Sequence, residues 1–390
     1  MTNKPVDRYY LSGIHYDTGR HVKIEVDNGL IVRLVETDHP GPDDEGLLIA
    51  PGLIDNQING YASVDFSGND LSPERFVNAA KEIWKTGVTT FLPTLITNSR
   101  ENLIRNFGVL RKALGINAMV AGSVPGFHLE GPYISSGEGY RGCHPVQYTR
   151  KPSWEEFGQF QEAAGGKIIQ VTLAPELQGA DEFIKLCASQ GIVTAMGHTD
   201  SLTSDVARAV ECGVRLSTHL GNGCANMIHR HNNPIWPQLA EEKLTPTIIA
   251  DGLHLLPEEL KVFLKVKGAS NLILTSDVMY LSGMAPGRYT FMDSEVVLTE
   301  DGMLKNVALN CLAGASFPLI TGVGNMMKHT GCSLEDAIGM ASPNAARIYN
   351  FHDRGTLSPG KRADLIMFEV KDFKLKIRKT ILNGELVYEQ

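Results

Sequence analysis

The sequence predicts an α/β protein: a (β/α)8 TIM barrel together with a small β-sandwich domain formed by both chain termini. Eight apolar, strand-like runs alternate with helical patterns, which is typical of parallel βα units. No GxGxxG or Walker motif follows the first run, whereas a doubly wound sheet usually carries a glycine-rich phosphate fingerprint there. The two chain ends share short alternating β patterns that the middle lacks, and this predicts the second, smaller domain.

The eight predicted barrel strands are spread over the middle of the chain. They lie at residues 52–58, 88–93, 124–130, 167–175, 192–198, 214–220, 245–251 and 271–277. The segments between them have recognisable helix ends. Ser72 is placed as an N-cap and Pro73 as the first helical residue. Ser153 and Glu156 have the spacing of a capping box, and Ser333 opens another helix after the eighth strand.

The chain ends are expected to fold together. Short strand patterns precede residue 51, and similar patterns follow residue 351, the last of them around an Asn-Gly turn that is typical of hairpins. We therefore expect residues 1–51 and 351–390 to form the small β-sandwich domain. Residues 52–350 are expected to form the metal-dependent catalytic barrel.

Composition excludes several classes of function. The 390 residues carry a net charge of −8, which argues against a nucleic-acid binder because such proteins normally present a basic face. The N-terminal segment lacks the apolar stretch of a signal peptide, and no apolar run approaches the ~20 residues of a membrane span, so no membrane association is expected. The six scattered cysteines form no CxxC pair, which indicates reduced thiols and a cytoplasmic protein.

Residues suited to metal binding stand at the ends of the predicted strands, where the active site of a TIM barrel is built. Glu130 ends the third strand and His198 the fifth. His219 ends the sixth and Asp277 the eighth. One carboxylate and two imidazoles suit a catalytic zinc, which keeps a further position for water. We predict these three residues as metal ligands and the aspartate as the acid/base group, its alternative role being a structural carboxylate.

Two neighbouring residues have more than one interpretation. His128 lies two positions before Glu130 and shares its strand face. It is either a further ligand or, as we favour, a partner buried in the core. Glu176 follows the fourth strand and is either a ligand or, as we favour, a structural carboxylate.

Several short motifs extend the pattern over nearly the whole chain. They are PGLIDNQING (51–60), GFHLEGPY (126–133), LAPE (173–176), MGHTDS (196–201), THLGN (218–222), IADGLH (249–254), SD (276–277) and LAG (312–314). HLEGP and ADGLH are the most specific of them. In these motifs and their order, the sequence resembles the N-acetylglucosamine-6-phosphate deacetylases of the amidohydrolase superfamily.

The resemblance implies an enzyme, a hydrolase acting on linear amides. Its expected reaction removes the acetyl group from an N-acetyl amino-sugar 6-phosphate, giving acetate and the amino-sugar phosphate by attack of a metal-activated water. The resemblance assigns metal binding to Glu130, His198 and His219 and the acid/base role to Asp277. It also implies that His144 helps to polarise the substrate carbonyl.

The resemblance further implies how the sugar phosphate is bound. His254 matches a residue that contacts the sugar, and Asn222 and Arg230 fall where the family contacts the phosphate. A guanidinium can hold a phosphate through two parallel hydrogen bonds, which suits this assignment. Gly131 and Leu312, inside two of the matching motifs, are expected on the substrate side as well. The family also implies a homodimer, with the Arg230 loop near the partner subunit.

The sequence departs from the superfamily at the first strand. Most amidohydrolases have His-x-His there, and this chain has Gln57 and Asn59, whose neutral amides are poor zinc ligands. We therefore expect one divalent metal per subunit, with Zn²⁺ favoured, although the ligand set also suits Fe²⁺, Co²⁺, Mn²⁺ or Ni²⁺. The loop after His219 differs from the usual family loop. In it, His229 and His231 either extend an anion site or are ordinary surface residues.

The altered loop after His219 leaves other functions open. One alternative is an amidohydrolase acting on a different N-acyl or cyclic amide substrate. Another, less favoured, is a barrel that has lost catalysis. The presence of all three ligand types and of the acid/base aspartate argues against the latter.

Overall fold

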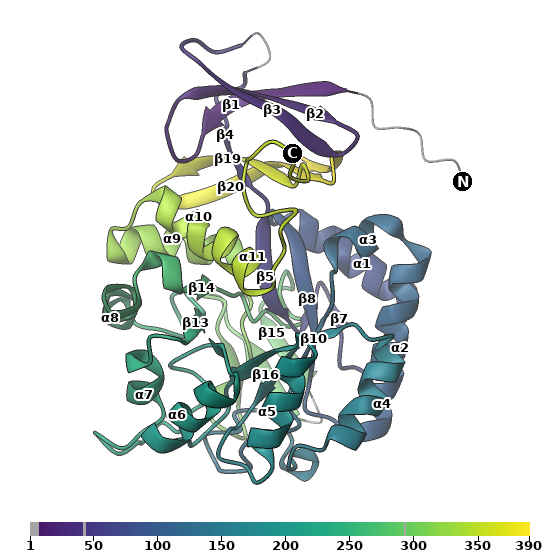
Figure 1. Ribbon diagram of the computed structural model, residues 1–390, viewed down its shortest axis with the longest axis vertical. Coiled ribbons are helices and arrows are strands. Elements are labelled where there is room, and N and C mark those ends of the chain that lie inside the picture. The colour runs from purple at the N-terminus through teal and green to yellow at the C-terminus, as the bar shows by residue number, and fades with distance from the viewer. Residues whose placement is uncertain (1–7, 42–43, 292–293) are drawn as a thin grey trace.

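The two chain ends meet in one β domain at one end of the barrel (Figure 1). The computed structural model describes residues 8–41, 44–291 and 294–390. Seven strands of this domain form a single sheet in the order β21-β20-β19-β4-β1-β2-β3. Their bounds are β1 Tyr9–His15, β2 His21–Asp27, β3 Leu30–Thr37, β4 Leu48–Pro51, β19 Leu365–Lys371, β20 Lys374–Leu382 and β21 Glu385–Glu389. Apolar residues from both chain ends, among them Ile24 and Met367, pack into a core of their own. The division of the chain at residues 51 and 351 stays a prediction.

Eight parallel strands form the barrel, in the order β14-β13-β12-β11-β10-β9-β8-β5. They are β5 Leu53–Ile58, β8 Val88–Ile96, β9 Phe127–Glu130, β10 Ile168–Leu173, β11 Val193–Met196, β12 Leu216–Ser217, β13 Thr245–Ile248 and β14 Ile273–Leu274. The first and last strands meet just past their ends, where Val278 pairs with Ile58 in a parallel bridge. Seven of the predicted strands contain an observed strand, and the second, predicted over 88–93, ends three residues before β8 does; the predicted fold class is confirmed.

Helices surround the barrel as the crossovers of its βα units (Figure 1). They are α1 Pro73–Trp84, α2 Arg100–Ile116, α3 Ala118–Ser123, α4 Trp154–Ala164, α5 Ala180–Ser189, α6 Thr203–Cys212, α7 Ile235–Ala240, α8 Pro257–Lys267, α9 Leu319–Thr330, α10 Leu334–Ala341 and α11 Pro343–Ile348, with short 3-10 turns at η1 Val146–Tyr148 and η2 Ala269–Asn271. The hydroxyls of Ser72, Ser153 and Ser333 each accept a hydrogen bond from a backbone N–H of the first turn, as predicted. Among the described residues, no helix has the length and apolar character needed to cross a bilayer.

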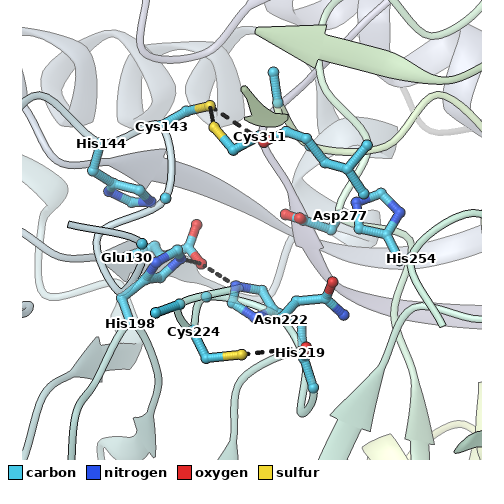
Figure 2. A pocket seen from close by; sticks show the side chains of 18 of the residues that line it. Glu130, Cys143, His144, His198, His219, Asn222, Cys224, His254, Asp277 and Cys311 are labelled. Atoms are coloured by element: carbon cyan, nitrogen blue, oxygen red, sulfur yellow. Dashed lines mark hydrogen bonds and ion pairs between the residues drawn. The ribbon is translucent and has the colours of Figure 1, made fainter. Parts of the chain in front are cut away.

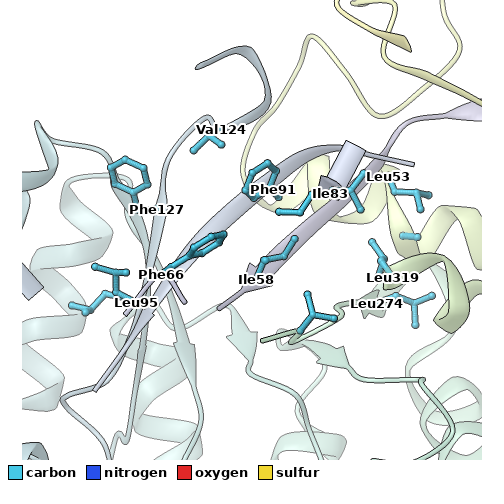
Figure 3. Close-up of a cluster of buried hydrophobic side chains, with 14 of the residues drawn as sticks. Leu53, Ile58, Phe66, Ile83, Phe91, Leu95, Val124, Phe127, Leu274 and Leu319 are labelled. Carbon is cyan, nitrogen blue, oxygen red and sulfur yellow. The ribbon is translucent and has the colours of Figure 1, made fainter. Parts of the chain in front are cut away.

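Alternate residues of the barrel strands pack on opposite faces, and this gives the barrel two apolar regions. Phe91 on β8 and Phe127 on β9 belong to the large cluster between strands and helices (Figure 3). Leu92, one residue after Phe91, belongs instead to the cluster that includes Ile54 and Ile273 from other barrel strands. That cluster continues onto α11, so apolar side chains fill one end of the barrel. Polar side chains gather at the other end.

A small antiparallel sheet follows the eighth barrel strand and was not predicted. It consists of β15 Gly287–Phe291, β16 Ser294–Leu298, β17 Leu304–Asn306 and β18 Cys311–Leu312. A further two-stranded ribbon, β6 Gly60–Tyr61 with β7 Val64–Asp65, follows the first barrel strand. Phe291 and Val296 of the small sheet pack on Met279, two residues beyond Asp277. The sheet therefore stands directly beside the carboxyl ends of the barrel strands.

Candidate active site

A cavity of about 380 Å³ opens at the carboxyl ends of the barrel strands. Eight of the predicted site residues line it: Glu130, His144, His198, His219, Asn222, His254, Asp277 and Leu312 (Figure 2). They come from strands and loops that are far apart in the sequence, and the barrel topology brings them to one face. Glu130, His198, His219 and Asp277, selected as strand ends, thus share one cavity with the four residues that the family resemblance implied.

Two histidines converge on one carboxylate oxygen at the floor of this cavity. Nε2 of His219 lies 3.0 Å from Oε1 of Glu130, and Nε2 of His198 lies 3.4 Å from the same oxygen. All three side chains are almost completely buried. A carboxylate and two imidazole nitrogens that point at one spot form a donor set that suits a divalent metal ion.

Backbone contacts fix the orientation of His198. Its Nδ1 lies 2.9 Å from the carbonyl oxygen of Tyr140, so Nδ1 carries the proton and donates it to that oxygen. The lone pair of Nε2 is then directed at the Glu130 carboxylate, which is how ligating histidines are commonly held by an outer partner. Nδ1 of His219 is buried and has no hydrogen-bond partner among the described residues.

Contacts with the two histidines shift the pKa of Glu130. Burial by itself raises that pKa, but the contacts with His198 and His219 outweigh burial and hold the pKa well below its usual range. Burial lowers the pKa of His219, yet the contact with Glu130 raises it more. The carboxylate therefore stays ionised, as a metal ligand must.

Asp277 faces the cluster from the last strand and is held by two amides. Nδ2 of Asn59 donates to its Oδ1 at 2.7 Å. Nε2 of Gln57 donates to the same oxygen at 2.8 Å and also to Oε1 of Glu130 at 2.8 Å. Burial, together with the nearby charge of Glu130, raises the pKa of Asp277. Gln57 thus links the acid/base candidate to the ligand candidate, a role that the sequence reasoning missed.

His144 lies on the loop that follows β9, on the opposite side of the cavity from Asp277 (Figure 2). Its Nδ1 is 2.7 Å from Oγ1 of Thr97, and its ring centroid is 4.3 Å from that of His198. Burial, with a smaller contribution from the neighbouring His198, lowers its pKa to about 3, so the ring is neutral. Its ring nitrogen also lies close enough to Glu130 and His198 for all three to offer ligand atoms within 4.8 Å of one another. His144 is therefore a geometric rival to His219 as the third ligand.

Three of the strand-end residues have an unusual backbone conformation. His198, His219 and Asp277 have φ angles of 51°, 32° and 52°, in the left-handed region that residues other than glycine seldom adopt. Such strain persists only where the surrounding structure enforces it, and it concentrates at functional sites. Side-chain periodicity in the sequence gives no signal for this conformation.

The upper wall of the cavity carries polar groups with free bonding capacity. Nδ2 of Asn222 is buried without a partner among the described residues, although the residue lines the cavity. Nδ1 of His254 is 2.8 Å from Oδ2 of Asp251, whose pKa is lowered because this contact outweighs burial. The other nitrogen of His254 is then left for the cavity, as for a group that contacts a polar ligand.

Two predicted substrate residues are not among those that line the cavity. Arg230 is exposed on the surface of the loop after β12. His229 and His231 beside it are also exposed. Gly131 is buried, with φ +74°, and a Cβ there would lie 2.1 Å from Oγ1 of Thr97. Glycine at this position leaves space for the Thr97 side chain, which contacts His144. That Gly131 contacts the substrate stays a prediction.

The two residues with open interpretations both contact protein groups. His128 is fully buried below the cavity, with Nε2 2.8 Å from Oγ1 of Thr172 and Nδ1 3.2 Å from Oγ1 of Thr94. Burial lowers its pKa to about 4. Glu176 accepts hydrogen bonds from Oγ1 of Thr199 and from the backbone N–H of Asp200, in the turn after His198. Both arrangements agree with the structural roles that were favoured.

Comparisons with known proteins agree with this geometry. Residues 48–387 match the model of the amidohydrolase family. The chain is 34% identical to the N-acetylglucosamine-6-phosphate deacetylase of Bos taurus, over 88% of this chain and 84% of the relative. It is 33% identical to that of Bacillus subtilis (strain 168), over 89% and 86%. The crystal structure of the Thermotoga maritima deacetylase superposes with a TM-score of 0.84 at 27% identity and covers 97% of this chain and 99% of that one.

Proposed function

The chain belongs to the amidohydrolase family and, within it, to the N-acetylglucosamine-6-phosphate deacetylases, and on this premise we propose that it hydrolyses the acetamide of N-acetylglucosamine 6-phosphate. The products are acetate and glucosamine 6-phosphate. One observation carries the proposal: Glu130, His198 and His219 converge at the floor of a cavity and Asp277 faces them from the last strand. This arrangement combines a ligand set with a proton acceptor, as metal-assisted hydrolysis requires.

Glu130, His198 and His219 are the proposed ligands of one divalent metal ion. Nε2 of His219 faces the same carboxylate oxygen as Nε2 of His198, which supports this set over one with His144 in place of His219. The Tyr140 carbonyl fixes the tautomer of His198, which both sets share. When bound, the ion supplies Lewis acidity, which polarises a carbonyl group and makes water more acidic. Zn²⁺ is the proposed ion because nitrogen and carboxylate donors in this number suit it.

Asp277 is the proposed proton carrier. Its Oδ1 is held by two amide donors, so Oδ2 is the oxygen that faces the reacting groups. As the oxygen of water bonds to the acetyl carbon, the carboxylate takes the water proton. It then delivers that proton to the sugar nitrogen as the carbon–nitrogen bond breaks. The raised pKa brings this group nearer to the working pH, which suits a general acid and base.

His144 is proposed to hold the acetyl carbonyl. Thr97 occupies its Nδ1, and a neutral ring has one donor and one acceptor nitrogen. When Nδ1 accepts from the threonine hydroxyl, Nε2 carries the proton and donates it into the cavity. A donor aimed at a carbonyl oxygen stabilises the negative charge that develops there during attack.

The phosphate site is proposed to be completed by a second subunit. Among the described residues that line the cavity there is no Lys or Arg, although a dianionic phosphate requires positive charge or several donors. Arg230 is exposed on a loop that also exposes Met227, with 90% of its surface accessible, and Trp236 in the first turn of α7 is 52% accessible and donates to the Arg230 carbonyl oxygen. A homodimer that buries this loop beside the partner's cavity would bring Arg230 to the substrate. A cytoplasmic location is also proposed, because the six cysteines are scattered along the sequence without a CxxC pair.

Acetate release from a substrate panel tests the function. We expect turnover of N-acetylglucosamine 6-phosphate to rise in proportion to the amount of bound metal. Turnover of unphosphorylated N-acetylglucosamine should be much weaker. Equal turnover of both sugars, or preference for an N-acyl amino acid, would instead support the second candidate, an amidohydrolase for another amide. The observation that favours this second candidate is that the lining, as far as the structure describes it, includes neither Lys nor Arg. Sedimentation analysis at several protein concentrations tests the dimer.

A further inference from the structure

We propose that Cys143 and Cys311 form a reversible disulfide in the wall of the active-site cavity, and that its formation slows turnover. This regulatory role rests on the proposed function, because it concerns the same cavity. Formation of the bond does not rest on that function and can be tested separately. The two thiols are separated by 168 positions in the sequence and are brought together by the fold.

The geometry of the pair carries the inference. The two Sγ atoms lie 2.8 Å apart, and Sγ of Cys143 also lies 3.2 Å from the carbonyl oxygen of Leu312. A disulfide holds its sulfurs at about 2.05 Å, so bond formation needs an approach of about 0.8 Å. Thiols already in contact meet the distance condition without rearrangement of the loops that carry them.

The pair is also accessible from the cavity. Both residues line it and are half-buried, and Figure 2 shows their sulfurs in contact on its wall. Cys187, by contrast, is fully buried in the apolar core. Cys224 lines the same cavity, but its Sγ lies 3.6 Å from the carbonyl oxygen of Gly221 and contacts no other thiol among the described residues. Access together with a partner thiol distinguishes Cys143 and Cys311 from the other cysteines.

The bond would join two separate walls of the active site. Cys143 directly precedes His144, the proposed carbonyl-binding residue. Cys311 begins β18, directly before Leu312, in the small sheet that packs on Met279. A covalent link would fix the distance between the His144 loop and this sheet, both of which line the path into the cavity. Shifts below 1 Å at catalytic groups, or loss of loop motion, reduce turnover.

The chemistry needs an oxidant, and a small-molecule disulfide such as oxidised glutathione supplies it. The thiolate of one cysteine attacks the glutathione disulfide, which forms a mixed disulfide and releases one reduced glutathione. The second thiolate then attacks the sulfur of the first cysteine and releases the second glutathione. Two protein thiols lose two electrons and two protons, and one oxidised glutathione becomes two reduced molecules.

The experiment uses the full-length, metal-loaded protein in glutathione buffers of increasing oxidised fraction. Free thiols are trapped by alkylation, and the digested protein is analysed by mass spectrometry for a Cys143–Cys311 cross-linked peptide. Acetate release and metal content are measured on the same samples. We expect the cross-link to appear together with a fall in turnover of about tenfold or more, at constant metal content, and a phosphine reductant to restore turnover.

Matched variants separate this pair from the other thiols. Cys143→Ser and Cys311→Ser are each compared with their own reduced form, and neither should lose turnover on oxidation. Cys224→Ser, which leaves the pair intact in the same cavity, should remain as sensitive as the unaltered protein. Cys332→Ser provides the same comparison outside the cavity.

Each contrary outcome has a distinct meaning. Absence of the cross-linked peptide in oxidising buffer overturns the disulfide. A cross-linked protein with unchanged turnover overturns the regulatory role and leaves the bond. Inactivation that persists in Cys143→Ser but disappears in Cys224→Ser overturns the proposal in favour of a mixed disulfide at Cys224. If reduced protein releases no acetate from the sugar phosphate, the proposed function fails, while the peptide analysis still decides whether the bond forms.

Discussion

The floor and the rim of the cavity differ in how completely one chain builds them. At the floor, Glu130, His219 and Asp277 are buried and joined by short contacts, with Gln57 shared between the two carboxylates. At the rim, part of the loop after β12 lines the cavity, but Arg230 and its neighbours His229 and His231 are exposed at the surface. Strand ends fix the floor, whereas the rim depends on loops. The difference indicates that one chain builds the floor completely, whereas the proposed phosphate site at the rim needs further contacts.

The largest expected effect concerns the floor. Asp277→Asn keeps the shape of the side chain but removes its capacity to accept and return a proton. General acid–base groups typically contribute 10²–10⁴-fold, so kcat should fall by about a thousandfold. Bound metal, measured by elemental analysis, should stay near one ion per subunit. Turnover that survives in this variant would exclude Asp277 as the proton carrier and would place the acid/base group elsewhere.

The second prediction tests the amide link within the floor. Gln57→Leu has similar volume but cannot donate to Glu130 or Asp277. Residues that orient ligands typically contribute 10–100-fold to metal affinity or activity, so we expect a loss of about that size. Asn59→Leu, which removes a donor to Asp277 alone, is the matched control and should leave metal affinity unchanged while lowering kcat. Equal metal affinity in both variants would contradict the shared role of Gln57.

The third prediction concerns the rim. Arg230→Ala should raise KM for the sugar phosphate by about tenfold to a hundredfold with little change in kcat, because a charge-assisted hydrogen bond would be lost from binding. Turnover of the unphosphorylated sugar should stay the same. Arg20→Ala removes a similarly exposed arginine from the terminal β domain and serves as control. If KM does not change, the phosphate is bound without Arg230 and the proposed dimer loses its main support.

The same contrast explains what the sequence could predict. Glu130, His198 and His219 were found because barrel strands are recognisable as apolar runs and their carboxyl ends share one face. The contact of Gln57 with two carboxylates, and that of Cys143 with Cys311, join residues far apart in the chain and leave no local pattern. The small sheet β15–β18 also escaped prediction, since short alternating segments resemble surface loops. Local periodicity thus reports elements, whereas contacts depend on how loops close over them.

The last prediction leaves activity aside and measures what burial near the floor costs in stability. Asp55, on the same strand as Gln57, accepts hydrogen bonds through Oδ1, but its buried Oδ2 finds no partner among the described residues. Burial raises its pKa from 3.8 to about 6, the hydrogen bonds opposing that shift. The folded state therefore binds the proton more tightly than the unfolded state. The resulting stabilisation is complete below pH 3.8 and is lost as the pH rises to about 6.

Asp55→Asn removes this titration from the stability profile. Two pKa units correspond to about 3 kcal/mol, so the unaltered protein should lose up to that much relative to the variant between about pH 4 and 6. Melting temperatures of both proteins across this range provide the measurement. Asp353→Asn is the control of opposite sign, because contact with Arg354 lowers the pKa of Asp353 and its contribution is lost as the pH falls. A difference in melting temperature between Asp55→Asn and the unaltered protein that stays the same at every pH would contradict this prediction. That result would show that Asp55 is ionised throughout this range and that its Oδ2 is solvated.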